Sequence, residues 1–303
     1  MRILVAGATG AIGKPLIDYL IEYGHEVYGT THSEERSKTL AAAGAKPLFL
    51  DVLNRDAVNS AMEKIRPDVV IDMLTSLPKT YTPESMRKAS EMDSKIRLEG
   101  GGHFLSAAET YGVKRYIAQS AAFWYAPGPG LADESCFFAY NASPGIASGC
   151  HVYSEIERRV LQSNKIEGVA VRFGFFYGPG TWFHPDGDMG EQVRKQQFPI
   201  IGKGQGIWNF VHIQDAAKAA AAAVYAAPGA YNVVNARPAM MREWLPAFAR
   251  YLGAPHPHHI TEEEGLAQFG ADSVYYATNL RGASYSKARS EFNFEPRSFE
   301  WML

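Results

Sequence analysis

Residues 1–13 constrain the fold more than any other part of the chain. An apolar run at 3–5 (Ile-Leu-Val) shows no alternation, which is typical of a strand buried on both faces. It leads directly into Gly7-x-x-Gly10-x-x-Gly13 and then into a helical pattern. Glycines at this spacing serve a tight turn, a close backbone approach to a pyrophosphate, and close packing of helix on strand. A strand, a glycine turn and a helix in this order predict a dinucleotide-binding unit, with phosphate at the helix N-terminus.

Length, charge and cysteine content narrow the class of protein. The chain has 303 residues, enough for one large domain or two joined ones. It carries 30 basic and 32 acidic residues, so nothing indicates a nucleic-acid or membrane partner. Cys136 and Cys150 are too few for a disulfide framework, and no metal site is predicted. Since the first strand begins at once and no apolar stretch could span a bilayer, we expect a cytoplasmic protein.

Short apolar runs alternate with helical patterns over the first half of the chain. This alternation predicts parallel βαβ units, that is, an α/β fold with a doubly wound parallel (Rossmann) sheet. The long helical stretch at 84–111 is interrupted by glycines at 100–102. The predicted strands are 3–5, 26–30, 47–50, 67–72, 113–118 and 168–173, and the other predicted helices are 12–21, 34–43, 54–65 and 150–163.

The residue composition of the sequence changes after residue 174. Glycine, proline and aromatic residues crowd the next stretch, which predicts a loop. We expect a dinucleotide-binding domain at 1–173, with its sheet completed by about 205–228, and a smaller substrate-binding part at 174–204 and 229–303. The elements predicted here are a loop at 174–188, strands at 207–212 and 231–234, helices at 216–227 and 240–252, and an irregular tail from 255.

Motifs spread over the chain carry a resemblance to a known family. They are Gly7-Ala-Thr-Gly10-Ala-Ile-Gly13, Asp51-Val52, Gly112-Val-Lys-Arg-Tyr-Ile-Ala-Gln-Ser120, Val171-Arg-Phe-Gly-Phe-Phe-Tyr177-Gly-Pro-Gly180, Asn209-Phe-Val-His-Ile-Gln-Asp215-Ala-Ala and Ser286-Lys-Ala-Arg. In this order they resemble the extended short-chain dehydrogenase/reductase superfamily, in its NAD-dependent epimerase/dehydratase group. The resemblance implies a nicotinamide dinucleotide cofactor, a small-molecule substrate and, through two long helices, a possible homodimer.

The catalytic pair of that superfamily is missing. Its members use Tyr-x-x-x-Lys on the helix after the fifth strand, where the tyrosine is the acid/base and the lysine lowers its pKa and holds the nicotinamide ribose. One alignment register puts His151 and Glu155 at these two positions, and the other puts Gly149 and Tyr153 there. Because a phenol needs a neighbouring cation to ionise near neutral pH, neither register restores the chemistry. The pattern resembles the atypical branch of the superfamily.

Four side chains remain as candidates for catalytic groups: Ser120, Tyr125, His151 and Tyr153. The superfamily's upstream hydroxyl falls on Ala121, one residue from Ser120, which is either a substitute or simply the end of the strand. Histidine, with an unperturbed pKa near 6.5, can act as an acid without a lysine partner. For each candidate, packing or hydrogen bonding is the alternative role.

The residues after the second strand bear on the choice of cofactor. NAD sites usually carry an acid there for the ribose diol, but here the segment is Thr30-Thr31-His32-Ser33, with Arg36 beyond. Small hydroxyls and these basic groups favour a 2′-phosphate, and hence NADP(H) over NAD(H). The resemblance puts the end of the third strand at the adenine and the end of the fourth along the ribose. The predicted cofactor-binding residues are Gly7, Thr9, Gly10, Ala11, Ile12, Gly13, His32, Arg36, Asp51, Val52, Leu74 and Thr75.

The loops at the carboxyl ends of the strands, where open α/β sheets bind ligands, are unusually aromatic. Some of these rings serve packing, and the rest predict an apolar pocket for a ring-bearing or otherwise apolar substrate. Few cations lie in these loops, which disfavours a charged nucleotide-sugar. The predicted pocket residues are Phe123, Trp124, Phe175, Phe176, Tyr177 and Trp182.

Three functions of different classes follow from these features. The first and favoured one is an NADP(H)-dependent oxidoreductase that reduces a carbonyl or enone of an apolar substrate, with a non-standard active site. The second is a dinucleotide-binding regulator or scaffold that has lost catalysis, as the missing pair suggests. The third is a non-redox lyase, isomerase or cyclase that reuses the pocket.

Overall fold

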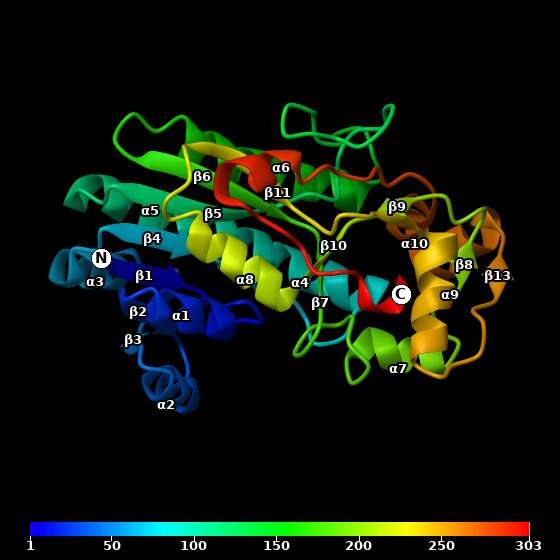
Figure 1. Ribbon diagram of the computed structural model, residues 1–303, viewed down its shortest axis with the longest axis horizontal. Coiled ribbons are helices and arrows are strands. Elements are labelled where there is room, and N and C mark those ends of the chain that lie inside the picture. The colour runs from blue at the N-terminus through cyan, green and yellow to red at the C-terminus, as the bar shows by residue number, and fades with distance from the viewer. Residues whose placement is uncertain (303) are drawn as a thin grey trace.

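The computed structural model describes residues 1–302, and a seven-stranded sheet forms its centre. All neighbouring strands are parallel, in the order β11-β6-β5-β4-β1-β2-β3 (Figure 1). This order confirms the predicted doubly wound sheet and creates a switch point between β1 and β4, where such folds bind ligands. The strands are β1 (Arg2–Ala6), β2 (Glu26–Thr31), β3 (Lys46–Phe49), β4 (Val69–Asp72), β5 (Arg115–Ala121), β6 (Glu167–Phe173) and β11 (Gly229–Val233).

Helices cover both faces of this sheet. Ile3 and Val5 join one core cluster with residues of α1 and α8, whereas Leu4 joins another with residues of α3 and α5. Successive side chains of a strand point to opposite faces, so β1 is buried on both faces as its apolar run predicts. The helices are α1 (Gly13–Glu22), α2 (Glu34–Ala42), α3 (Arg55–Ile65), α4 (Pro83–Lys95), α5 (Gly101–Tyr111), α6 (Pro144–Leu161) and α8 (Ile213–Ala222).

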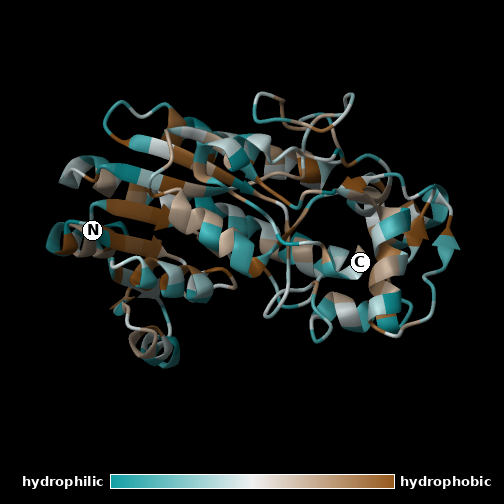
Figure 2. Ribbon diagram, viewed as in Figure 1, coloured by the Kyte–Doolittle hydropathy of each residue, from teal (hydrophilic) through white to brown (hydrophobic). Residues whose placement is uncertain are grey.

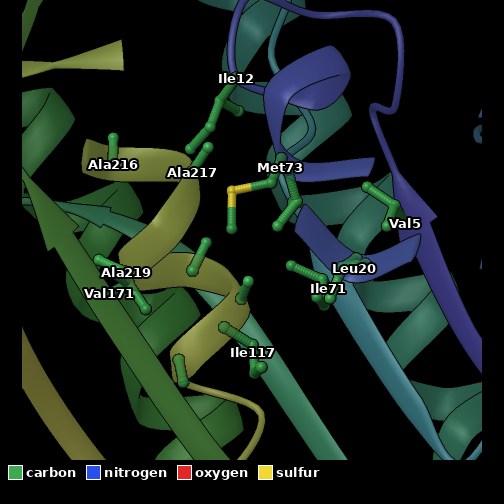
Figure 3. Packing of buried hydrophobic residues seen from close by; sticks show 14 of the residues in the cluster. Val5, Ile12, Leu20, Ile71, Met73, Ile117, Val171, Ala216, Ala217 and Ala219 are labelled. Atoms are coloured by element: carbon green, nitrogen blue, oxygen red, sulfur yellow. The ribbon is translucent and has the colours of Figure 1, made fainter. Parts of the chain in front are cut away.

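The alanine-rich helix α8 packs close to the sheet and to α1. Figure 3 shows Ala217 next to Ile12 and Met73, at the edge where the glycine turn leaves β1. Because alanine has a small side chain, the helix can approach the strands closely without creating a cavity. This packing holds the start of α1 against the ends of β1 and β4.

The long helical stretch before β5 contains a π turn. After α4 the chain forms π-helical hydrogen bonds over Ile96–Gly100 and then continues as α5 through the glycines. The glycines are needed because the helix passes close to β4: a Cβ on Gly101 would lie 2.5 Å from Oδ2 of Asp72. The predicted interruption is therefore a change of helical pitch rather than a break.

The remainder of the chain forms a smaller part beside the carboxyl ends of the strands (Figure 1). An aromatic core, including Phe175, Trp208 and Trp244, holds it together. Figure 2 shows the most hydrophobic residues concentrated in the strands. The elements are β7 (Phe175–Tyr177), α7 (Asp188–Arg194), β8 (Ile200–Ile201), β9 (Ile207–Trp208), β10 (Phe210–His212), β12 (Ala239–Met240), α9 (Met241–Tyr251), β13 (His259–Ile260), α10 (Glu262–Thr278) and a 3₁₀ turn (Glu300–Met302). Helix α11 (Ser286–Phe292) instead packs on β11 and the core of the central sheet.

The structure corrects three predictions in this half. The strand predicted at 207–212 is two short strands, β9 and β10, which pair outside the central sheet. The edge strand is instead β11, so 229–233, predicted to lie in the smaller part, belongs to the sheet. The tail from 255 is not irregular but contains α10 and α11. Within residues 1–302, no helix is long and apolar enough to cross a membrane.

Candidate functional site

The turn after β1 can be made only by glycines. Gly7 has φ +79°, and a Cβ on it would lie 2.6 Å from the carbonyl oxygen of Met73. A Cβ on Gly13 would lie 2.0 Å from the carbonyl oxygen of Ala8, closer than any real contact. The N–H of Gly7 donates to Oγ1 of Thr30 at 3.0 Å, which ties the turn to β2. The backbone path therefore requires glycine at 7 and 13, whereas a Cβ on Gly10 would meet only the carbonyl oxygen of Gly7, at 3.3 Å.

The same turn leaves backbone donors free. Helix α1 begins at Gly13 without a side-chain cap. Across the described part of the chain, the N–H groups of Ala11 and Ile12 find no hydrogen-bond acceptor. Unused N–H groups at a helix N-terminus favour an anion. These residues therefore fit the diphosphate of a dinucleotide, and Thr9 and Gly10 lie in the same turn.

The ends of β2 and β3 carry the residues predicted at the adenine side. His32 and Arg36 are both exposed, next to Ser33, whose side chain caps α2. Both basic side chains are thus free to approach a 2′-phosphate. Asp51 instead accepts a hydrogen bond from the N–H of Leu53 at 2.9 Å, so its carboxylate shapes the loop after β3.

A buried carboxyl group lies at the end of β4. Asp72 accepts hydrogen bonds from the N–H of Leu74 at 3.0 Å and from the hydroxyl of Tyr116 at 2.8 Å. Burial raises the pKa of Asp72, while both hydrogen bonds and the more distant Arg97 oppose the rise. Leu74 is itself buried, and Thr75 is exposed just beyond it.

Ser120 belongs to a closed polar network. Its hydroxyl donates to Oε1 of Glu157 at 2.5 Å, and the side chain is 2% exposed. The guanidinium of Arg172 donates to both oxygens of Glu157, at 2.7 and 2.6 Å. The network joins β5, α6 and β6, and no part of Ser120 is presented to a ligand.

Tyr125 completes this network on the other side of Arg172. It accepts from Nη1 of Arg172 at 2.8 Å and donates to Asn232 at 2.5 Å. Burial raises the pKa of Tyr125 to about 12, although Arg172 opposes the rise. With its hydroxyl engaged twice and its pKa raised, Tyr125 serves to join β11 to β6.

The structure places a tryptophan where one alignment register expects the catalytic tyrosine. A Cβ on Gly149 would lie 2.1 Å from Cζ3 of Trp124, so the indole ring covers this position of α6. The indole N–H donates to the hydroxyl of Tyr276 on α10 at 3.0 Å. Trp124 is thus fixed from both sides, and no larger residue than glycine fits at 149 in this arrangement.

Tyr153, one turn further along α6, occupies the position of the superfamily's lysine in the same register. Its ring centroid is 5.7 Å from that of Trp124 and 5.1 Å from the guanidinium carbon of Arg97. Burial raises the pKa of Tyr153, and Arg97 opposes the rise. His151 lies apart from this group, exposed beside Tyr140.

Most of the predicted pocket rings gather in one aromatic cluster. The rings of Phe123 and Phe175 stack at 4.3 Å, and Trp124 meets Phe123 edge-on at 5.0 Å. On the far side, Trp182 lies 4.8 Å from Tyr81. Phe183 connects the two groups, because its ring lies 6.0 Å from that of Tyr81 and 6.1 Å from that of Phe175. We define the aromatic cluster as Tyr81, Phe123, Trp124, Tyr153, Phe175, Trp182, Phe183 and Tyr276.

Two predicted pocket residues lie elsewhere. Phe176 packs on the core that contains α1 and α8, because alternate residues of β7 face opposite sides. Tyr177 borders a separate cleft of about 320 Å³ together with His212 and Arg297. Neither residue contributes to the aromatic cluster.

Sequence reasoning missed Arg97, Tyr81 and Tyr276. Arg97 stands between Ile96 and Leu98 in a helical stretch, and the π turn that brings it inward leaves no periodic signal. Tyr81 precedes α4 in a loop, and Tyr276 comes from the tail that was predicted to be irregular. Only contacts between distant segments reveal these three.

Comparison with known proteins agrees with this architecture. The sequence model of the NAD dependent epimerase/dehydratase family matches residues 3–235. A 3-diazoavenalumate denitrifying reductase from a Streptomyces species is 36% identical over 99% of this chain and 98% of its own. A 2-alkyl-3-oxoalkanoate reductase from Stenotrophomonas maltophilia is 27% identical over 93% of this chain and 86% of its own.

Solved structures agree on the fold. A UDP-glucose 4-epimerase from Thermotoga maritima superposes with a TM-score of 0.76 over 100% of this chain and 96% of its own, at 18% identity. A UDP-glucose 4-epimerase from Thermus thermophilus, in complex with NAD, gives a TM-score of 0.73 at 24% identity, over 99% and 96% of the two chains. At these identities the likeness concerns the architecture alone.

Proposed function

The chain belongs to the NAD-dependent epimerase/dehydratase family, and from this premise we propose that it is an NAD(P)H-dependent reductase of ring-bearing substrates. One observation carries the proposal: Trp124 covers Gly149, so an aromatic surface replaces the acid of the standard site. A reductase built in this way suits a substrate that accepts a hydride without receiving a proton in the same step.

The physical distinction lies in the charge of the hydride acceptor. When bound, a reduced nicotinamide dinucleotide supplies a hydride. A ketone that accepts it becomes an alkoxide and needs a proton donor, which contributes roughly 10²- to 10⁴-fold to the rate. A cationic acceptor becomes neutral and needs none. The hydroxyls of Ser120 and Tyr125 are already bonded within the protein, which favours the second kind of substrate.

The relative that is 36% identical points to one such acceptor, because it is a denitrifying reductase of a diazo compound. We extend this chemistry to the present chain and propose an arenediazonium ion as substrate. Hydride adds to the terminal nitrogen, and cation and hydride together give a neutral aryldiazene. The aryldiazene then loses its N–H proton to water, the C–N bond breaks and N₂ leaves. The ring carbon, which keeps the electron pair of that bond, takes a proton from water. The sum is one arene and one N₂ for each hydride.

The chain's own residues supply binding and exclusion of water. The free N–H groups of Ala11 and Ile12 would hold the diphosphate, and His32 and Arg36 favour NADP(H) over NAD(H). The half-buried rings of Phe123 and Trp124 would contact the substrate ring and keep water from it. Since Tyr276 of α10 fixes Trp124, residues 174–204 and those after β11 are proposed as the substrate-binding part.

Three substrates with a common aryl carboxylate frame test the proposal: a diazonium ion, a ketone and an enone. With the diazonium ion, loss of NADPH should match release of N₂ and exceed the rate with heat-denatured protein. The ketone and the enone should react at least about 100-fold more slowly, since Gly149 replaces the acid of the standard site and the hydroxyls of Ser120 and Tyr125 are engaged within the protein. NADH should replace NADPH with a higher KM.

Two results would contradict this function. The first is a folded protein that binds the dinucleotide and oxidises it with none of the three substrates, which would favour a regulator or scaffold. The second is a ketone that reacts faster than the diazonium ion, which would require a proton donor in the site. Trp124→Ala removes the aromatic surface and should slow the diazonium reaction, and Trp124→Phe, which keeps such a surface, is its matched control.

A further inference from the structure

Arg97 is a buried cation that is held from one side only. Its side chain is 4% exposed, and its Nε donates to Oδ2 of Asp93 at 2.8 Å. The other oxygen of Asp93 accepts from the N–H of Ser76 at 2.6 Å, just beyond β4. Asp93 thus fixes the inner edge of the guanidinium and connects it to the loop at the switch point.

The outer edge of the guanidinium is unused. Within residues 1–302, the two terminal nitrogens of Arg97 donate no hydrogen bond. These four N–H donors are not sealed from solvent, so they face space that a small molecule can enter. A guanidinium that is almost wholly buried and yet presents its donors to such a space is suited to an oxygen-rich ligand.

A second unpartnered group lies beside the first. Tyr153 is 8% exposed, and its hydroxyl makes no hydrogen bond with any described residue. The guanidinium carbon of Arg97 is 5.1 Å from the centroid of its ring. A cation and a phenol, from the π turn and from α6, therefore lie side by side, each largely buried but with donors that a ligand can reach.

This place adjoins the strip that the dinucleotide is proposed to occupy. The π turn that carries Arg97 packs under residues predicted to bind the cofactor: a Cβ on Gly100 would lie 3.1 Å from Val52. Tyr153 stands where one register expects the lysine that holds the nicotinamide ribose. A π turn often marks a functional site, and this one turns an arginine inward.

We propose that Arg97 does the work of the missing lysine: its free N–H groups, together with the hydroxyl of Tyr153, bind the hydroxyls of the ribose on the nicotinamide side. The proposal rests on the cofactor binding of the proposed function but not on its substrate. The cation comes from the helix before β5 instead of the helix after it. Arg97 and Tyr153 are then cofactor-binding residues and donate no proton to the substrate.

Two fragments of the cofactor isolate this ribose. ADP lacks it and ADP-ribose contains it, and their 2′-phosphate forms serve equally if the protein prefers NADP(H). Calorimetry on the folded apoprotein should show that the wild type binds ADP-ribose more tightly than ADP. Arg97→Met should lower the affinity for ADP-ribose by at least about 10-fold, the factor for one lost hydrogen bond to a charged group. The affinity for ADP should fall by less than about two-fold.

Further variants keep the test decisive if Arg97→Met folds poorly. Arg97→Lys keeps the charge with fewer donors and should give an intermediate loss for ADP-ribose only. Tyr153→Phe should weaken ADP-ribose by about two- to five-fold, because one neutral hydrogen bond is removed. Arg87→Met removes an exposed arginine of the same helix and should change neither affinity.

Three outcomes would overturn the proposal. They are an equal loss for ADP and ADP-ribose in Arg97→Met, no loss for either, and a wild type that does not distinguish the two fragments. If the variant instead raised only the KM of an aryl carboxylate, Arg97 would bind substrate, and the proposal would be wrong. A failure of the diazonium reaction leaves these affinities untouched, so the two proposals can fail separately.

Discussion

The two buried arginines of this molecule, Arg172 and Arg97, differ in what their nitrogens do. Arg172 donates to both oxygens of Glu157, to the hydroxyl of Tyr125 and to the carbonyl oxygen of Glu134. Arg97 donates only to Asp93 among the described residues. Four of the five N–H donors of Arg172 are thus engaged, and this charge holds the fold together, whereas the unused donors of Arg97 suit a ligand.

This difference divides the candidate site into a structural and a functional region. Ser120 and Tyr125, predicted as catalytic groups, belong to the region of Arg172 and are fully engaged. Tyr153 belongs to the region of Arg97, and its hydroxyl is free. The sequence alone proposes Ser120, Tyr125 and Tyr153 as equal candidates for catalytic groups. Their hydrogen bonds separate the first two, which are engaged, from Tyr153, which is free.

The largest loss of stability is expected in the hydrogen-bonded network around Arg172. Arg172→Met leaves Glu157 buried without its partner, and the free energy of unfolding should fall by about 3–5 kcal/mol. Urea denaturation at neutral pH measures the loss. The double variant Arg172→Met/Glu157→Met removes both charges and should recover much of it. A loss below about 1 kcal/mol in the single variant would mean that this network is not what joins the strands.

A smaller effect is expected where Trp124 covers α6. Gly149→Ala places a Cβ 2.1 Å from the indole ring, so the ring must move, at a cost of about 1–3 kcal/mol. Ser148→Ala, exposed on the same helix, is the control and should stay within about 0.5 kcal/mol. If both variants were equally stable, the indole would not be held over this position.

Ser120→Ala should change the stability of the protein but not its turnover. The loss of one hydrogen bond to Glu157 should lower the free energy of unfolding by about 1 kcal/mol. Because the hydroxyl is not presented to a ligand, the turnover rate should stay within about two-fold of the wild type. If turnover instead slowed by about two orders of magnitude while stability stayed unchanged, Ser120 would be catalytic after all.

The smallest effect concerns pH. Burial raises the pKa of Asp72, so the folded protein binds this proton more tightly than the unfolded chain does. Stability should therefore fall as the pH rises from the ordinary carboxyl pKa near 4 to the raised value in the fold. Asp72→Asn, which cannot ionise, should flatten this slope in denaturation curves recorded at several pH values. If the slope did not change, other titrating groups would cause the dependence of stability on pH.

The glycine turn and the sheet could be predicted from the sequence because each rests on local pattern. The run at 3–5 and Gly7 specify a buried strand and a turn that only glycine permits. Helix α10 was missed even though Thr261 and Glu264 form a capping box at its start, which is a readable signal.

The site was less predictable because its decisive contacts join distant segments. Ser120 meets Glu157 on α6, and Trp124 meets Tyr276 on α10. No periodicity reveals such pairs. Arg97 lies in a helical stretch where the π turn shifts the facing of every later residue, so a 3.6-residue pattern assigns its side chain incorrectly.

The claim that this site transfers hydride without an acid from the protein can be tested through one rate. The measurement is the single-turnover oxidation of bound NADPH by an arenediazonium carboxylate, recorded from about pH 6 to 8 with normal and 4-deuterated cofactor. We predict a rate that is slowed by deuterium and does not change with pH. A rate that falls about tenfold per pH unit above an apparent pKa would reveal a proton donor in the protein and contradict it.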